Sequence, residues 1–529
     1  MAGSSCPLES LPVEIIEFIL PDLSLDDIRH LRLTSQTVCR NASAGHFKTF
    51  CRRKTVDLRV PALRRMSERI TRGSVASDLR HLTLTGMLYV PLSLEKVLRT
   101  KTVPADPTDT FGRRKDALGN NIATRPCRLP ATDEQIAETE RDLARLRAGQ
   151  HEAAGDRASA EDLAALTELF TRIRAHGVAR GLDSLTLSVA VARSSRTRLA
   201  PEDGGAFQPI ADTAQHTLDL ALRAVAASGL PLRGLDVYET VRACSVSSHD
   251  LSRILPGITD RGTALHGLRC LALSTSPHAL LSTACPDRAD PDALQREGAA
   301  LQRGQRIHRH RVEASAARAA LAAQHAEPDG AGLAALLRRL PQLEELDWHR
   351  YHFATDHPLD NDDADHDESA GGRGLFAHAV RHSQSRALRR LTLRGWMVDA
   401  ADILGLLRQN PRLEDVTLRH VTLRKGTWYA IFRHLPDALP AYTRIYLDVL
   451  HEQAHPNVPW AFMQLPLADA HLEARGCPAS GGLGALLLEG SALVPGGIGY
   501  EVSRQQCDCA QAARWWCEAR GEYGPPEHG

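Results

Sequence analysis

Two stretches of the sequence carry the same arrangement of helix-forming and strand-forming residues. LLRRLPQLEELDW begins at Leu336, and LLRQNPRLEDVTL begins at Leu406, 70 residues further on. In each, a leucine-rich segment of helical character ends close to a proline, which cannot continue a helix. The chain then reads leucine-x-x-apolar-x-apolar, and its last residues alternate as those of a half-buried strand do. Each stretch therefore predicts a helix that ends near the proline and leads directly into a strand.

The strand phrase recurs along most of the chain, in nine ordered copies. The clear copies begin at Leu79, Leu182, Leu232, Leu268, Leu343, Leu388 and Leu413, and weaker ones begin at Tyr442 and Leu483. One strand and one helix cannot bury their shared apolar face alone, so stacked neighbours must complete it. The pattern resembles a leucine-rich repeat with irregular spacing. This resemblance implies an α/β fold, an irregular solenoid of parallel strands and helices over residues 56–505, with residues 506–529 as a tail.

Three insertions in this array are expected to lie outside the core, as helical or disordered segments. They cover about residues 104–158, 291–328 and 354–373. The last contains seven acidic residues and no lysine or arginine between Asp356 and Glu368. Like-charged runs of this kind are usually solvated. The run also lacks a glycine at the sixth loop position, so it does not predict an EF-hand calcium site.

Residues 1–55 follow a different pattern, centred on LPVEIIEFILPDLSLDDIRHLRLTS at residues 11–35. Its first apolar residues have the spacing of one helical face, and Pro21 ends that helix. Ser24 with Asp27 three residues later predicts a capping box at the start of a second helix. A third helical segment contains Val38, Phe47 and Phe50. Three helices of this size bury little surface alone.

This stretch resembles the F-box. The matching positions are Leu11, Pro12, Glu14, Ile15, Ile19, Leu23, Ile28, Leu31, Leu33 and Ser35, whereas Val38 stands where the family often has tryptophan. The resemblance implies docking onto the Skp-type adaptor of a cullin-based (SCF) ubiquitin ligase. The candidate adaptor contacts are Leu11, Pro12, Ile15, Ile19, Leu23, Ile28 and Leu31. The alternative is an ordinary three-helix bundle that caps the next domain.

Composition excludes several broad classes of protein. Lysine plus arginine and aspartate plus glutamate number 64 each among the 529 residues, so the formal charge is zero. This balance argues against a general affinity for nucleic acid or anionic membranes. The sequence shows neither a secretory signal nor an apolar run of membrane-spanning length, and its eleven cysteines are scattered. We therefore expect a cytoplasmic or nuclear protein with reduced thiols.

One motif suggests an enzyme instead. His451, Glu452 and His455 match the H-E-x-x-H pattern, in which two histidines one helical turn apart bind zinc and the glutamate acts as a general base. Pro456 disfavours helical geometry at His455, and Glu473 is only a loosely spaced candidate for a third ligand. We expect a surface loop after a repeat strand here, without metal or cofactor. A zinc-dependent hydrolase remains the alternative.

The preferred hypothesis is a substrate-recognition subunit of an SCF-type ligase, in which other subunits perform the catalysis. Residues between the strand leucines of a leucine-rich repeat face the concave side. The candidate contacts to a protein substrate of unknown identity are Asp236, Tyr238, Asp347, His349, Thr392, Arg394, Thr417 and Arg419. A repeat scaffold without any connection to ubiquitin is a further alternative.

Overall fold

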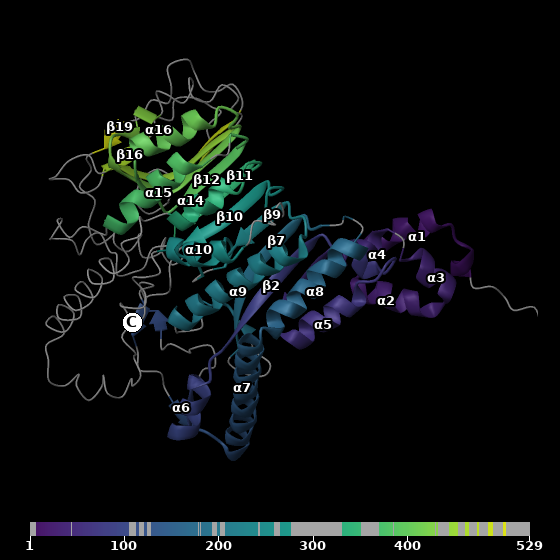
Figure 1. Ribbon diagram of the computed structural model, residues 1–529. Coiled ribbons are helices and arrows are strands. Elements are labelled where there is room, and N and C mark those ends of the chain that lie inside the picture. Colours follow the sequence, from purple (N-terminus) through teal and green to yellow (C-terminus); the bar gives the residue numbers. More distant parts are fainter. Residues whose placement is uncertain are drawn as a thin grey trace, which may run out of the picture.

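The structure is a computed structural model of the 529-residue chain. It describes residues 7–43, 45–104, 113–115, 121–123, 128–177, 179, 181–192, 198–201, 207–241, 244–258, 265–276, 331–350, 370–383, 386–428, 430–431, 444–452, 461–464, 473–475, 485–489 and 501–503. Within these ranges the protein is a mixed α/β fold built on a large, mostly parallel sheet (Figure 1). The expected fold class is confirmed at this level.

The parallel strands lie side by side in the order in which they occur along the chain. They are β1 (Arg53–Asp57), β2 (His81–Tyr89), β7 (Ser184–Ala192), β9 (Gly234–Val237), β10 (Cys270–Thr275), β11 (Glu345–Arg350), β12 (Arg390–Arg394), β14 (Asp415–Lys425) and β15 (Arg444–Glu452). Each of these strands after β1 begins at the third residue of one copy of the leucine-x-x-apolar-x-apolar phrase. Neighbouring copies pair position for position, as in Leu271 with Leu346 and Leu346 with Leu391.

A layer of helices covers one face of this sheet (Figure 1). Its members are α5 (Val60–Arg69), α8 (Glu161–His176), α9 (Phe207–Ser228), α10 (Ser248–Ile254), η5 (Leu255–Gly257), α14 (Ala331–Arg338), α15 (Ala370–His382) and α16 (Ala400–Gln409). The phrase leucines point toward these helices and are buried with them in one core. As predicted, α14 ends before Pro341 and α16 ends before Pro411. The other side of the sheet, which we call the open face, carries the residues between the leucines.

Shorter strands lie outside this order, and most of them pair antiparallel. Two separate two-stranded sheets consist of β3 (Thr102–Pro104) with β6 (Arg128–Pro130), and of β4 (Arg113–Lys115) with β5 (Asn121–Ala123). The short strands of the large sheet are β8 (Arg198–Leu199), β13 (Met397–Asp399), β16 (Ala461–Gln464), β17 (Glu473–Arg475), β18 (Ala485–Glu489) and β19 (Glu501–Ser503). The phrase copy at Leu483 falls on β18, which pairs antiparallel with β15. This copy does not extend the parallel array, because alternation of apolar residues specifies a strand but not its direction.

Within residues 104–158 the expected helical character is confirmed for the last part, but its expected position outside any core is wrong. This segment forms most of α7 (Asp133–Ser159), which begins at a Thr132 capping box. Leu146 of α7 is buried with Met87 and Ala192, next to α6 (Leu92–Thr100). Two buried leucines are enough to hold a charged helix against its neighbours, and the overall polarity of a segment does not reveal them. The insertions at 291–328 and 354–369 lie outside the described residues.

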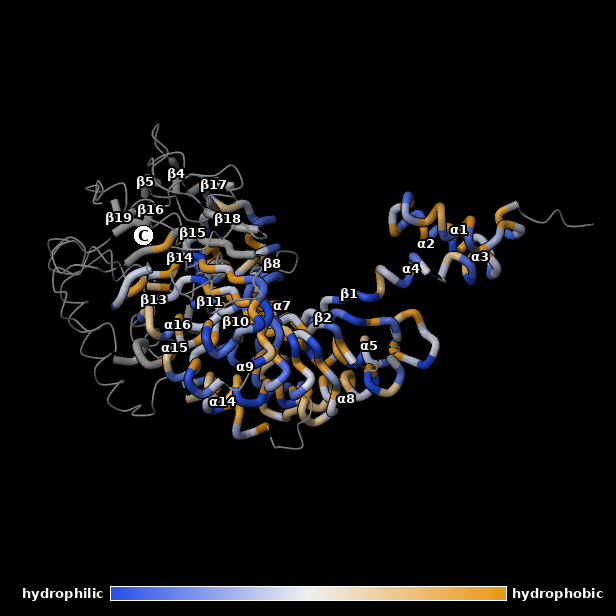
Figure 2. Tube along the Cα trace, turned by 90° about the horizontal axis from the view of Figure 1, so that it is seen from above, coloured by the Kyte–Doolittle hydropathy of each residue, from blue (hydrophilic) through white to orange (hydrophobic). Residues whose placement is uncertain are grey.

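The N-terminal helices form a separate lobe at one end of the sheet (Figure 2). They are η1 (Pro7–Ser10), α1 (Val13–Ile19), η2 (Leu20–Asp22), α2 (Leu25–Thr34), α3 (Gln36–Asn41) and α4 (His46–Thr49). Their own small core consists of Ile16, Leu20, Ile28, Ala42 and Phe47. The predicted helix end near Pro21 and the Ser24–Asp27 capping box are confirmed. Val75 of η3 (Val75–Asp78) packs against this core and joins the lobe to the sheet.

Candidate functional site

The N-terminal lobe exposes large apolar side chains on its outside. On α1, Phe18 is 79% exposed, Ile15 46% and Ile19 39%, and we call these three residues the α1 stripe. Leu8 and Leu33 of the same lobe are also exposed. Outside the lobe, Leu129 is the one large apolar residue in the described part of the chain whose side chain is comparably exposed. Gathered exposed apolar groups mark interaction surfaces more often than scattered ones do.

The seven predicted adaptor contacts divide into three groups. Pro12, Ile15 and Ile19 are exposed, whereas Leu11, Leu23 and Leu31 are half-buried and pack against the lobe core. Ile28 is fully buried, so its assignment to the adaptor surface is wrong: it lies on the inward side of α2. Phe18 was missed by the sequence analysis. Helical spacing signals it, because residue 18 lies on the side of residues 15 and 19, while Ile16 and Leu20 point inward.

Polar contacts hold the helices of the lobe in place. The Glu17 carboxylate of α1 accepts hydrogen bonds from the backbone N–H groups of Gly45 and His46, at 2.7 and 2.6 Å, at the start of α4. The guanidinium carbon of Arg32 lies 3.8 Å from the Phe47 ring centroid. Ser35 caps α3 by accepting from the Val38 N–H. These contacts fix the small lobe in one arrangement and so fix where the α1 stripe points.

The open face of the sheet brings most of the predicted substrate contacts together. Asp236, Asp347, Thr392 and Thr417 occupy the same phrase position on β9, β11, β12 and β14, and Ala272 of β10 lies between the two aspartates. All four side chains are half-buried. Arg394 and Arg419 follow in the next row and are also half-buried. The register of the strands therefore aligns these side chains in rows across the sheet.

Two of the predicted contacts are not available on this face. Tyr238 follows the end of β9 with a φ of 62°, is fully buried, and donates from its hydroxyl to the Ala214 carbonyl oxygen of α9. The left-handed backbone turns this residue toward the helix layer, and the phrase pattern cannot show that. His349 lies on β11 but is buried, with its Nδ1 3.3 Å from Ser274 Oγ. The assignments of Tyr238 and His349 to the substrate surface are wrong.

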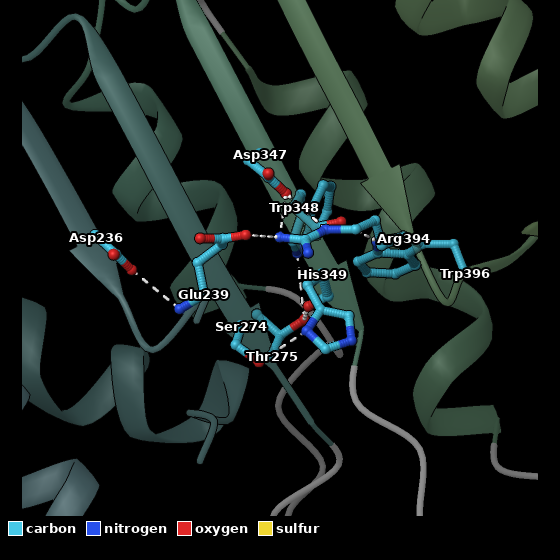
Figure 3. A network of polar contacts seen from close by, with 9 residues as sticks. All are labelled: Asp236, Glu239, Ser274, Thr275, Asp347, Trp348, His349, Arg394 and Trp396. Atoms are coloured by element: carbon cyan, nitrogen blue, oxygen red, sulfur yellow. Dashed lines mark hydrogen bonds and ion pairs between the residues drawn. The ribbon is translucent and has the colours of Figure 1, made fainter. Parts of the chain in front are cut away.

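An ion-pair network occupies the centre of the open face (Figure 3). Arg394 Nη2 lies 3.0 Å from Asp347 Oδ1 and also pairs with the Glu239 carboxylate. The Glu239 N–H in turn donates to Asp236 Oδ1 at 3.0 Å. The Arg394 side chain is only 11% exposed. Glu239 was missed by the sequence analysis, because it lies in the turn after β9 and outside the phrase.

Two carboxyl groups of this network, those of Asp236 and Asp347, have raised pKa values. The pKa of Asp236 is raised to about 6, chiefly by burial and also by the charges of Glu239 and Asp347, although the hydrogen bond from the Glu239 N–H and the charge of Arg394 lower it. Burial likewise raises the pKa of Asp347 to about 6, with Arg394 and Arg419 opposing the rise and Glu239 adding to it. Desolvation and like charges both disfavour an ionised carboxylate. The arginines therefore compensate these carboxylates only in part.

The H-E-x-x-H segment does not form a helix at its start. His451 and Glu452 end strand β15 and pair with Thr422 and Leu423 of β14. Both residues have extended backbone, so the helical turn that the zinc motif needs does not begin here. His455 lies outside the described residues, and Glu473 begins β17. Among the residues that the structure describes, no three His, Cys, Asp or Glu side chains gather as a metal site would require.

Two further observations bear on the class of protein. No helix in the described ranges has the length and apolar character that crossing a bilayer demands. Comparisons with protein-family models and with curated proteins find no match to this chain. Two surfaces of the chain itself are candidates for function, the apolar surface of the N-terminal lobe and the open face of the sheet.

Proposed function

We propose that this chain is a substrate-recognition subunit of an SCF-type ubiquitin ligase, acting in the cytoplasm or nucleus. In this proposal residues 1–55 are an F-box that binds the Skp-type adaptor, and the following sheet and helices are an irregular leucine-rich-repeat solenoid that binds the substrate. Other subunits of the ligase, reached through the adaptor and cullin, perform the catalysis. The observation that carries the proposal is the α1 stripe within the F-box-like sequence.

The α1 stripe supports a protein partner on physical grounds. Burying one large aliphatic or aromatic side chain contributes about 1.5–3 kcal/mol. The lobe core contacts the rest of the chain through Val75 of η3, whereas the stripe residues stay exposed. A lobe that served only to cap the sheet would gain by turning these apolar groups inward. An adaptor that covers Ile15, Phe18 and Ile19 gives a reason for their exposure.

The open face supports the second half of the proposal. Its half-buried side chains stand in rows on consecutive parallel strands, so they form a broad surface rather than a closed pocket. Broad surfaces of this kind are typical binding faces of repeat proteins. The phrase leucines are committed to the core, which leaves the rows between them for a ligand.

Co-purification with the Skp-type adaptor tests the proposal. Wild-type protein should recover the adaptor, and an Ile15→Asp, Phe18→Asp variant should lose at least about tenfold of that recovery, because two buried contacts would become buried charges. Leu129→Asp is the matched control, since Leu129 is 49% exposed but belongs to β6 and not to the lobe. Failure of the wild type to recover adaptor, or equal losses in both variants, contradicts the proposal. Thermal melting checks that each variant is folded.

A further inference from the structure

The segment around β1 carries a strong excess of positive charge. From Lys48 to Arg80 it contains ten lysine or arginine residues and three acidic ones, although the whole chain is formally neutral. Two of the acidic residues, Asp57 and Asp78, are buried and already paired with arginines. The third, Glu68, is exposed on α5. The surface of this segment is therefore basic.

Four exposed cations of the segment belong to β1 and α5, and we call them the edge cations. They are Arg53, Lys54, Arg65 and Arg69. Among the residues that the structure describes, none of the four is paired with a carboxylate. They are thus available to an anionic partner without the loss of an existing ion pair.

The two edge cations of α5 lie at the same end of the sheet domain as β1. The helix packs against β1 and is the first of its layer. Arg64 Nη2 lies 3.1 Å from Glu161 Oε2 of α8, so this side of α5 faces α8. Arg65 and Arg69 are one helical turn apart and point away from α8. They therefore border the end of the molecule that the edge of β1 forms.

One side of β1 has no neighbouring strand. β1 ends the sheet next to the lobe (Figure 2), and in the described part of the chain it pairs with β2 alone. The carbonyl oxygen of Arg52 and the N–H of Leu58 bond to β2, at 2.8 and 2.9 Å. Backbone groups of a parallel strand turn alternately to its two sides. The N–H and C=O groups of Arg53 and Thr55, both exposed residues, are therefore turned to the unpaired side.

The chemistry of this edge selects its partner. An unpaired edge strand is a template for another extended segment. Cations on it disfavour pairing with β1 of a second copy, because like charges would lie opposite each other, and for the same reason they favour an acidic strand. Among the described side chains of residues 45–103 no large apolar group is exposed. The surface therefore lacks the apolar groups that insert into a bilayer and the exposed aromatic rings that stack on nucleic acid bases.

We propose that the edge of β1, together with Arg65 and Arg69, binds an extended acidic segment of a partner protein by strand addition. The backbone of the partner pairs with Arg53 and Thr55, and its carboxylates face the edge cations. This surface is separate from the α1 stripe and from the ion-pair network on the open face. The inference therefore goes beyond the proposed function and does not depend on it.

Fluorescence anisotropy on the full-length chain tests the inference. The probes are fluorescein-labelled threonine–glutamate and threonine–serine peptides of equal length, and the glutamate peptide with N-methyl groups on its central residues. The glutamate peptide should bind at least about tenfold more tightly than the serine peptide at low salt, and high salt should reduce this preference. The N-methylated peptide should bind at least about fivefold more weakly than its parent, because it cannot donate backbone hydrogen bonds.

Substitutions separate the charges of the edge from its backbone. The Arg53→Glu, Lys54→Glu variant should lose the glutamate preference. Thr55→Pro keeps every cation and removes one outward N–H, a change that edge strands tolerate. It should weaken binding of the glutamate peptide at least about fivefold, whereas Thr55→Val should not. Arg408→Glu, Arg412→Glu is the matched control, because it makes the same change of charge on exposed residues in and after α16. This control should keep the preference, and thermal melting checks that each variant is folded.

Several outcomes would overturn the inference. Equal binding of the glutamate peptide and its N-methylated form would exclude strand addition. A glutamate preference that survives in the Arg53→Glu, Lys54→Glu variant would exclude the site, and tighter binding of an oligothymidylate of equal charge would indicate a nucleic acid partner. Absence of peptide binding would mean that the cations only protect the edge from self-pairing. Adaptor recovery should be equal for the wild type and this variant, so the test is independent of the ligase proposal.

Discussion

The N-terminal lobe and the parallel sheet differ in how completely they bury their large apolar side chains. The sheet directs its phrase leucines into one continuous core and leaves polar side chains on its open face. The lobe has a core of only five buried residues and leaves the α1 stripe exposed. The difference suggests two kinds of contact: an apolar one on the lobe, and one governed by charge on the sheet.

The largest stability effect is expected in the core of the sheet domain, at Trp348. Its ring packs against Phe376 and Trp396, with ring centroids 5.3 and 4.2 Å away, and its Nε1 donates to Thr275 Oγ1. Trp348→Ala should lower the free energy of unfolding by about 3–5 kcal/mol. Chemical denaturation followed by tryptophan fluorescence measures the loss. Adaptor recovery should be retained, since the lobe has its own core; a loss below about 1 kcal/mol would contradict this packing account.

The contrast between buried and exposed residues within the lobe gives the next effect. Ile28 is fully buried, so Ile28→Ala should destabilise the lobe by about 2–4 kcal/mol. Ile15→Ala should change its stability by no more than about 0.5 kcal/mol, because the side chain is already exposed. Hydrogen exchange of the α2 amides measures both. Equal losses in the two variants would mean that Ile15 belongs to the lobe core.

The charged open face predicts a pH dependence of stability. The folded-state pKa of Asp236 and of Asp347 is about 6, above the 3.8 of an unperturbed aspartate. The folded state therefore binds more protons between these values, and stability from these groups is lost as pH rises from about 4 to about 7. Each shift is worth about 3 kcal/mol. Urea unfolding across this range should show a flatter profile for the Asp236→Asn, Asp347→Asn variant, and parallel profiles would refute the raised pKa values.

The smallest effect concerns the start of α2. Ser24 Oγ accepts from the Asp27 N–H at 3.2 Å, and the Asp27 carboxylate accepts from the Ser24 N–H. Ser24→Ala should cost about 1 kcal/mol. Asp26→Ala is the control, because the exposed Asp26–Arg29 pair contributes at most about 0.5 kcal/mol. Thermal melting of the two variants should rank them in this order.

Much of the sheet could be predicted because its signal is repetitive and local. Alternating leucines fix which residues face the core, and neighbouring copies then fix the register. Strand β1 was missed because Lys54, exposed on the edge of the sheet, occupies the position where the other copies have an apolar residue. The direction of β18 and the turn at Tyr238 depend on long-range pairing and on one backbone angle. Neither is encoded in the spacing of apolar residues.

The candidate surfaces were predictable in outline but not in detail. Rows such as Asp236, Asp347 and Thr392 follow from strand alternation alone. The partnership of Glu239 with Arg394 joins residues 155 apart in sequence and required the three-dimensional arrangement. In the lobe, the F-box resemblance placed Ile28 among the adaptor contacts, although this residue is buried. Helical spacing predicts Phe18 as a surface residue, because it lies on the same side of α1 as Ile15 and Ile19.

Hydrogen–deuterium exchange of the full-length chain, with and without purified Skp-type adaptor, tests the central claim most directly. The proposal predicts new protection of backbone amides in α1 and α2, around the α1 stripe, and unchanged exchange in β9 to β14. The Ile15→Asp, Phe18→Asp variant should show no new protection. Protection that appears only on the sheet, or no protection at adaptor concentrations that saturate a known F-box protein, would contradict the assignment of the lobe as an adaptor-binding F-box.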